Sequence, residues 1–174
     1  MQGPLAGVRV LDLTSMISGP LCTMTLADQG ADVIKVESPA GDYARHVATR
    51  RNGFSASFVN NNRNKRSIVL DLKQPSALLA LERLIDCADV MVQNFRPGVA
   101  ERMGIGPIKA CQRNPALIYL SICGFGFDGP YRDKPVFDPL IQALSGLTTI
   151  QGGSDEARPR LVRTILPDKL TAIQ

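Results

Sequence analysis

The sequence predicts an α/β fold in which helices cover both faces of a parallel sheet. Short apolar runs rich in β-branched residues alternate along the chain with stretches of helical spacing, and this alternation is typical of parallel, helix-covered sheets. The chain of 174 residues contains 44% hydrophobic and 21% charged residues. It is therefore long and apolar enough to form one folded domain with a core.

The first part of this sheet is a β-α-β unit. Residues 8–13 (VRVLDL) and 32–37 (DVIKVE) are short β-branched runs and are expected to be strands. Residues 19–29 between them open with Gly-Pro and are closed by Gly30, which are typical helix start and stop signals. A helix of this length fits a right-handed crossover between parallel strands.

The chain after the second strand is first irregular and then alternates again. Residues 42–65 are polar and are expected to form a long irregular connection, of a kind that is often functional. A helix that begins at Gln74-Pro75 carries apolar residues at helical spacing as far as Ile85. Further strands are expected over 67–71, 89–95 and 116–122, and further helical segments over 97–103, 108–113 and 138–145.

The predicted topology also predicts where a ligand binds. In parallel sheets ligands bind outside the carboxyl ends of the strands. The segments that follow the predicted strands, and the apolar run near residue 161, should therefore converge on one edge. These segments are residues 15–20, Leu72 and Lys73, residues 94–96, residues 124–130, and Asp168.

Charge and composition exclude several classes of partner. The net charge is +4, only 5% of the residues are aromatic, and the basic residues are scattered, so a nucleic-acid-binding protein is not expected. The chain has no apolar run long enough to span a bilayer and no signal peptide. We therefore expect a cytoplasmic protein without a membrane partner, whose modest positive charge suits a small polyanionic ligand.

The counts of histidine and cysteine exclude two kinds of chemistry. With His46 as the single histidine, expected in an exposed loop, a multi-histidine metal site is not possible within this sequence. No metal is expected. A carboxylate is then the nucleophile that needs no partner, because it is ionised at pH 7. The four cysteines lack C-x-x-C spacing and are expected to be buried thiols rather than disulfides or metal ligands: Cys22, Cys87, Cys111 and Cys123.

Two carboxylates stand at predicted helix starts. Asp168 follows Pro167 in the first turn of a helix, where free backbone N–H groups and the positive end of the helix dipole favour an anion. For Asp168 both helix capping and a reactive carboxylate are open. For Asp138, at the start of the 138–145 helix, both an N-cap and a second active-site carboxylate are open.

Other local patterns are compatible with an anionic ligand. Residues 18–20 (SGP) suit either an anion or an ordinary helix start. Lys73, Arg96 and Arg102 follow strand ends; each alone is best explained as a solvated charge, but together they favour a polyphosphate. The G-x-G-x-x-G match at 124–129 opens no helix, because prolines flank it, and is interpreted as a turn rather than a dinucleotide site.

Taken in order, these segments resemble the N-terminal part of the family III CoA-transferases, which include formyl-CoA and carnitine CoA-transferases. The resemblance implies a partial Rossmann-like large domain over residues 1–174, with the small domain and the C-terminal return absent from this chain. It also implies an interlocked homodimer for the full-length protein. The segments that carry the resemblance are 4–13 (PLAGVRVLDL), 19–20 (GP), 30–37 (GADVIKVE), 64–67 (NKRS), 70–71 (LD), 88–90 (ADV), 94–98 (NFRPG), 102–104 (RMG), 124–126 (GFG), 129–130 (GP), 137–139 (FDP), 142–143 (QA) and 145–146 (SG).

The resemblance further implies a reaction and a set of site residues. Asp168 would be the nucleophile that attacks an acyl-CoA, giving a mixed anhydride and then an aspartyl-CoA thioester from which CoA passes to a carboxylic acid. Coenzyme A enters as acyl-CoA substrate, and no metal takes part. By the same resemblance CoA would contact Ile17, Ser18, Leu70, Asp71, Leu72, Lys73, Asn94, Phe95, Arg96, Arg102, Met103, Lys134, Phe137 and Asp138.

Three positions depart from related enzymes and narrow the activity. Formyl-CoA transferases carry glutamine and arginine where this chain has Ile17 and Ser38, which argues against formate or oxalate as substrate. Racemases of the same superfamily carry histidine where this chain has Phe137, which favours a CoA-transferase over an acyl-CoA racemase. A non-catalytic CoA-binding fragment is the alternative from a different class.

Overall fold

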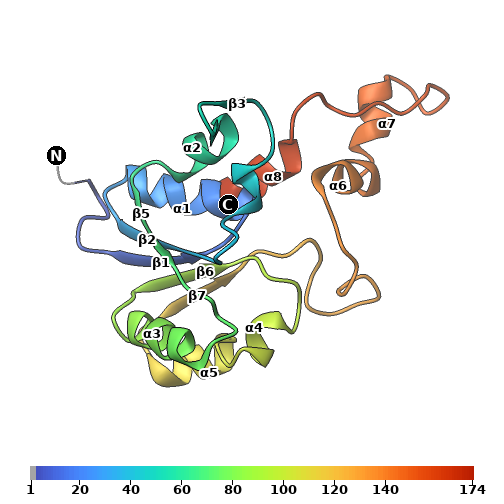
Figure 1. Ribbon diagram of the computed structural model, residues 1–174. Helices are drawn as coiled ribbons and strands as arrows, with labels where there is room; N and C mark the ends of the chain where they lie inside the picture. The colour runs from blue at the N-terminus through green and yellow to red at the C-terminus, as the bar shows by residue number, and fades with distance from the viewer. Residues whose placement is uncertain (1–2) are drawn as a thin grey trace.

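Five parallel strands form the central sheet, in the spatial order β5-β2-β1-β6-β7 (Figure 1). The structure is a computed structural model that describes residues 3–174. All neighbouring strands run parallel, which confirms the predicted class of sheet. The strands are β1 (Arg9–Leu13), β2 (Asp32–Glu37), β5 (Lys65–Val69), β6 (Val90–Gln93) and β7 (Ile118–Ser121).

Helices cover both faces of this sheet, as predicted (Figure 1). One face carries α1 (Ser18–Asp28), α2 (Ala56–Asn62) and α8 (Leu166–Ile173). The other carries α3 (Pro75–Asp86), α4 (Val99–Arg102) and α5 (Pro107–Arg113). Two further helices, α6 (Asp138–Leu144) and α7 (Leu147–Gly152), lie away from the sheet, and α6 packs against α8.

The core consists of two apolar clusters, one on each face of the sheet. In β1, Leu11 and Leu13 join the cluster that packs under α3, while Val10 joins the cluster on the side of α1. Successive side chains of a strand point to opposite faces, so β1 is buried on both. This explains why β1 is an almost continuous apolar run rather than an alternating one.

The connection over residues 42–65 is more regular than expected. It contains a short 3-10 helix, η1 (Tyr43–Arg45), a hairpin of β3 (Arg50–Arg51) and β4 (Phe54–Ser55), and then α2. Its polar residues make turns and caps: Asn52 and Gly53 have φ of 51° and 81° at the hairpin turn, and the Ser55 hydroxyl accepts the Phe58 N–H at 3.3 Å. Asn-Gly is a strong hairpin signal, and the prediction of an irregular segment overlooked it.

Two smaller expectations are corrected. Strand β5 ends at Val69, two residues earlier than predicted, so Leu70 and Asp71 lie in the loop beyond it. The four cysteines are free thiols, but none is fully buried, and Cys87 at the end of α3 is exposed. Among residues 3–174, no helix has both the length and the apolar character needed to cross a bilayer.

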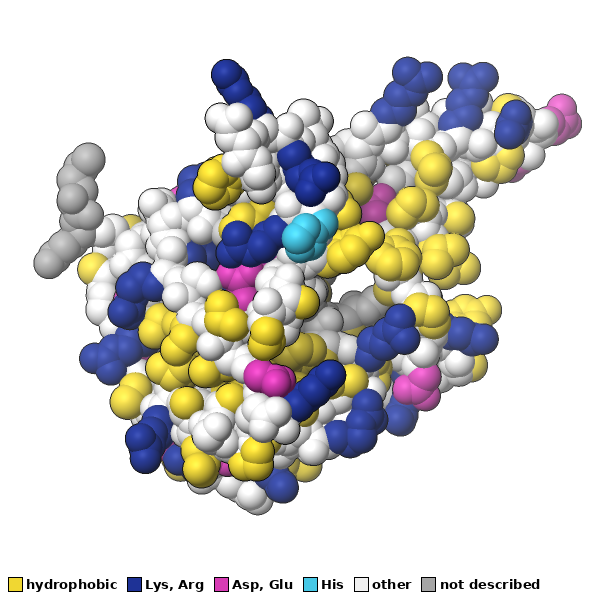
Figure 2. Space-filling model, viewed as in Figure 1, with side chains coloured by type: hydrophobic (Ala, Val, Ile, Leu, Met, Phe, Trp, Pro, Cys, Tyr) yellow, Lys and Arg dark blue, Asp and Glu magenta, His cyan; other side chains and the backbone are white. Residues whose placement is uncertain are grey.

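The surface view agrees with the scattered basic residues of the sequence. Lys and Arg side chains are spread over the visible face rather than gathered in one block (Figure 2). His46, the single histidine, lies exposed on this face after η1, as the sequence predicts.

Glu37, at the end of β2, is expected to contribute to the free energy of unfolding in a way that is lost in acid. Burial raises its pKa, but hydrogen bonds from Arg45, Ser67 and the Asp42 N–H outweigh burial and lower the pKa to about 2. This stability is present above the unfolded pKa of 4.5 and is lost as the pH falls toward 2. In Glu37→Gln, urea unfolding at pH 7, 4 and 3 should show lower stability at pH 7 and a weaker pH dependence. The exposed Glu156→Gln is the matched control, and an unchanged pH dependence in Glu37→Gln would contradict the assignment.

Candidate active site

Asp168 lies where the first turn of α8 meets the start of α1. Its Oδ1 accepts a hydrogen bond of 2.5 Å from the Ser18 hydroxyl, across 150 positions of sequence. Ser18 is the first residue of α1, and Asp168 is in the first turn of α8. The packing of these two helices therefore brings together the predicted nucleophile and one predicted CoA contact.

The backbone of Asp168 is held by α6. Asp138 Oδ1 accepts the Asp168 N–H at 3.1 Å, and Asp138 Oδ2 accepts from Gln142 Nε2 at 2.6 Å. Gln142 also donates to the Thr164 carbonyl at 3.0 Å and accepts the Val162 N–H at 2.8 Å. Asp138 and Gln142 are almost completely buried. Their hydrogen bonds therefore fix residues 162–168, the segment that leads into α8, and position Asp168.

Neither Asp168 nor Asp138 caps the helix that contains it. The N-cap of α8 is Ile165, and no side chain caps that end from within α8, so Asp168 is not a capping residue. Asp138 does not cap its own helix either, because the N-cap of α6 is Phe137 and carries no side-chain bond. Of the two roles left open for Asp138, the N-cap of α6 is excluded: the Asp138 carboxylate instead accepts an N–H of the first turn of α8, a group that no α8 carbonyl reaches.

The environment of Asp168 makes its carboxylate more basic than usual. Burial raises the pKa of Asp168, the hydrogen bond from Ser18 lowers it, and the charge of Asp138 raises it; the net direction is upward from 3.8. A higher pKa goes with a stronger oxygen nucleophile. The Ser18 hydroxyl at the same time stabilises the ionised form that a nucleophile needs.

The loop from β1 to α1 lies at the switch point of the sheet. The connection after β1 leaves to the face of α1, while the connection after the neighbouring β6 leaves to the face of α4 and α5 (Figure 1). The two loops are joined by a reciprocal pair of hydrogen bonds: the Ser15 N–H donates to Asn94 Oδ1 at 2.9 Å, and Asn94 Nδ2 donates to the Ser15 carbonyl at 2.8 Å. Such crevices are the usual ligand sites of open parallel sheets.

A glycine allows α1 to begin close to this loop. A Cβ on Gly19 would lie 2.3 Å from the Cβ of Thr14, so no larger residue fits without movement. The close approach keeps Ser18 beside the carboxyl end of β1.

A hollow of about 290 Å³ opens at this carboxyl edge. Three of the predicted CoA-binding residues line it, namely Leu70, Leu72 and Phe95. The sequence prediction missed its other wall, because it did not follow the loop after β2. That wall comprises Ser38, Gly41, Asp42 and Tyr43.

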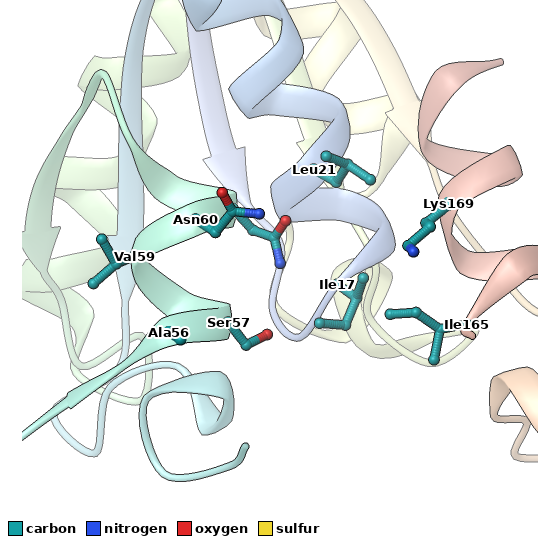
Figure 3. A pocket seen from close by; sticks show the side chains of 9 residues that line it. Ile17, Leu21, Ala56, Ser57, Val59, Asn60, Ile165 and Lys169 are labelled. Carbon is teal, nitrogen blue, oxygen red and sulfur yellow. The ribbon is translucent and has the colours of Figure 1, made fainter. Parts of the chain in front are cut away.

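A second, more open hollow of about 670 Å³ lies between α1, α2 and α8. In Figure 3, Ile17, Ile165 and Lys169 stand on one side of it, facing Asn60 and Ser57 of α2. Lys169 is the chain neighbour of Asp168, and Ile17 is the neighbour of Ser18. This hollow therefore adjoins the contact between Ser18 and Asp168.

The remaining predicted CoA contacts are not gathered by the fold of this chain. Met103 packs on the core cluster, as Phe95 does, and Asp71 accepts the N–H of Lys73 in its own loop at 3.2 Å. Four basic residues have exposed side chains that form no ion pair within residues 3–174, namely Lys73, Arg96, Arg102 and Lys134. The side chain of Phe137 is also exposed.

The glycine-rich segment after β7 is a turn, as predicted. No helix begins between Ser121 and Asp138. Within the segment Phe125 packs on Tyr131 with ring centroids 5.5 Å apart. The G-x-G-x-x-G match therefore does not lead into a helix N-terminus, which a dinucleotide-binding motif needs.

Two substitutions should move the pKa of Asp168 in opposite directions. Ser18→Ala removes the hydrogen bond that lowers this pKa, so the pKa should rise. Asp138→Asn removes the charge that raises it while an amide oxygen still accepts the Asp168 N–H, so the pKa should fall. Titration of the Asp168 carboxyl by ¹³C NMR measures both. A shift in the same direction for both variants would contradict the contacts described.

The family of this chain follows from comparison with known protein families. The sequence model of the family described as CoA-transferase family III matches residues 5–174, and the chain belongs to this family.

Individual relatives agree with this assignment. A probable fatty acyl-CoA transferase of Mycobacterium tuberculosis is 40% identical, over 95% of this chain and 42% of that protein. A succinyl-CoA:glutarate CoA-transferase of Mus musculus is 41% identical, over 97% of this chain and 40% of that protein. A crystal structure of a CaiB/BaiF family protein from Brucella suis superposes with a TM-score of 0.93 at 35% identity, over 99% of this chain and 47% of that chain. The chain thus spans about two fifths of the length of the curated relatives it matches.

Proposed function

We propose that this chain forms the nucleophile-bearing, CoA-binding part of an enzyme that transfers CoA from an acyl-CoA to a carboxylic acid. Membership of the CoA-transferase family III supports the class of reaction. The observation that carries the proposal is the half-buried Asp168 carboxylate, hydrogen-bonded to Ser18 and held by Asp138.

In the proposed reaction every step is an acyl transfer between oxygen and sulfur. An Asp168 oxygen attacks the thioester carbonyl, the carbon–sulfur bond breaks, and CoA leaves as thiolate from a mixed anhydride. The thiolate attacks the aspartyl carbonyl of the anhydride, which releases the first carboxylate and leaves an aspartyl-CoA thioester. The acceptor carboxylate then attacks the aspartyl carbonyl of this thioester, which expels CoA thiolate and forms a second mixed anhydride. The thiolate attacks the acceptor's carbonyl in that anhydride, which gives the new acyl-CoA and frees the Asp168 carboxylate. No proton changes hands, so no histidine base is required.

The site residues have distinct roles in this proposal. Asp168 is the catalytic nucleophile, and the Ser18 hydroxyl is a donor for oxyanions that develop at its carboxyl. The hollow with Leu70, Leu72 and Phe95 suits the flat base of CoA, since apolar walls with a few polar groups are typical of such sites. The other residues of the sequence prediction, of which Asp138 is buried and the rest are exposed or partly exposed, would meet the rest of CoA: Ile17, Asp71, Lys73, Asn94, Arg96, Arg102, Met103, Lys134, Phe137 and Asp138.

The wider organisation is part of the same proposal. The whole protein would have a separate small domain, and a C-terminal return of the chain would complete the large domain to which this chain contributes. Two such proteins would form an interlocked homodimer in the cytoplasm. Isoleucine at position 17 and serine at position 38 favour donors and acceptors other than formate and oxalate.

The test is a transfer assay on the full-length protein that contains this chain. The protein is incubated with a panel of acyl-CoAs and carboxylic acids, and new acyl-CoA products are separated by chromatography. Formation of the acceptor's CoA thioester supports the proposal. Deuterium uptake at the acyl α-carbon without transfer would instead indicate a racemase, and CoA binding without any reaction would indicate a non-catalytic binding protein.

A further inference from the structure

The turn that leads into Ser18 contains a left-handed residue. Met16 has φ of 70°, a conformation that non-glycine residues adopt only at a cost. It stands two positions before Ser18, the donor to Asp168. The conformation of this turn therefore sets the direction in which α1 begins and where the Ser18 hydroxyl lies.

The buried ion pair of Lys35 and Asp42 contacts the backbone of this turn at Thr14 and at Met16. Asp42 Oδ1 accepts the Met16 N–H at 3.0 Å, and Asp42 Oδ2 lies 3.0 Å from Lys35 Nζ. Lys35 Nζ in turn donates to the Thr14 carbonyl at 2.8 Å. The side chains of Lys35 and Asp42 are each only 1% exposed. Asp42 Oδ1 also accepts the Ala44 N–H at 2.9 Å, which ties the carboxylate to η1.

We infer that Asp42, oriented by Lys35, is a positioning residue that keeps Met16 left-handed and so holds the Ser18 hydroxyl against Asp168. The inference rests on the proposed function, because it concerns the same nucleophile. Neither Asp42 nor Lys35 touches Asp168. Their effect passes through the backbone of residues 14–17.

A role in stability alone predicts something different. Replacing both partners of a buried ion pair is often neutral for stability, whereas removing one leaves an unpaired buried charge. If Asp42 acted only as the partner of Lys35, removing both charges together would leave the site intact. If Asp42 acts on Met16, what matters is whether the residue at position 42 still offers an acceptor.

Two double variants separate these roles in the full-length protein. Lys35→Met with Asp42→Asn removes both charges but keeps an amide oxygen for the Met16 N–H, and it is the reference for the second variant, since Asp42 also lines the hollow beside Phe95. Lys35→Met with Asp42→Ala removes the acceptor as well. Its kcat should be about 10-fold or more below that of the asparagine variant, because small displacements of a catalytic group are costly, while KM for acyl-CoA differs by less than about 3-fold between the two variants. Equal kcat in the two double variants would overturn the inference.

A rescue variant tests the role of the turn itself. Glycine adopts positive φ readily, so adding Met16→Gly to the Lys35→Met, Asp42→Ala variant should restore most of the lost kcat. A general loss of stability would not be repaired by a glycine, which adds disorder to the unfolded chain. Failure of Met16→Gly to restore any activity would overturn the inference.

A measurement without turnover keeps this inference separate from the proposed function. The carboxyl of Asp168 is titrated by ¹³C NMR in the full-length variants, with Asp168→Asn to assign the signal. The alanine variant should show a higher Asp168 pKa than the asparagine variant, as is also expected of Ser18→Ala, because the hydroxyl contact is lost. If the wild type transfers no CoA, the proposed function fails, but this difference still decides whether Asp42 positions Ser18. An identical titration in both variants would refute it.

Discussion

Asp168→Asn is expected to abolish CoA transfer while the protein stays folded. An amide is not a nucleophile toward a thioester, so kcat should fall by at least ~10³-fold, as happens when nucleophiles of covalent enzymes are removed. Asparagine has nearly the same shape, its Oδ1 can still accept from Ser18, and its backbone N–H still reaches Asp138. Steady-state assay of transfer, with thermal unfolding measured in parallel, checks the prediction.

The control for Asp168→Asn is a substitution of the same chemical kind outside the site. Asp155→Asn changes an exposed carboxylate in a turn and should leave kcat unchanged. If Asp168→Asn kept more than about a tenth of the wild-type kcat, Asp168 would not be the nucleophile, and its carboxylate would serve only to anchor Ser18.

Asp12→Ala is expected to give the largest loss of stability. Asp12 is completely buried in β1; its Oδ2 lies 2.9 Å from Lys65 Nζ, and its oxygens also accept from Thr14 and Thr23. Removing one partner of a buried ion pair costs about 3–5 kcal/mol, because the other charge is left buried and unpaired. The free energy of unfolding, measured by urea denaturation of the full-length protein, should fall by that amount.

The pH dependence of this loss has a definite sign. Burial lowers the pKa of Lys65 to about 8, and Asp12 opposes that shift. Without Asp12 the pKa of Lys65 falls further, so Lys65 becomes neutral at a lower pH. The stability deficit should therefore shrink as the pH rises toward 8.

The matched control for Asp12→Ala is an exposed pair on the neighbouring strand. Asp32→Ala breaks the ion pair with Arg66, whose side chain is 65% exposed, and exposed pairs contribute about 0–1 kcal/mol. Equal losses for Asp12→Ala and Asp32→Ala would show that burial of the Asp12 contact has no energetic weight.

The fold could be predicted because local pattern and tertiary structure agree. The apolar run of β1 is buried on both faces, and the helical spacing from Pro75 to Ile85 matches α3. The resemblance to family III CoA-transferases rested on ordered short segments and is confirmed by the family match over residues 5–174. The hairpin at Asn52 and Gly53 was also predictable from its turn residues, but the polar composition around it concealed the signal.

The site was predictable only in part, because its contacts join residues far apart in sequence. Asp168 in a first helical turn could be read from Pro167, but its bond to Ser18 depends on how α8 packs against α1. The contact of Asp138 could not be predicted for the same reason: sequence relates a carboxylate to its own helix, whereas this one accepts from the backbone of another helix. The hydrogen bond from the Met16 N–H to Asp42 has no local sequence signal at all.

The nucleophilic role of Asp168 is tested most directly by the mass of the protein during turnover. Full-length protein is incubated with acyl-CoA, digested and mapped by mass spectrometry, with hydroxylamine to trap the activated carboxyl and Asp168→Asn as the control. A CoA thioester, and after hydroxylamine a hydroxamate, is expected on Asp168 alone. Transfer activity with no adduct on Asp168, or with an adduct on another residue, would contradict it.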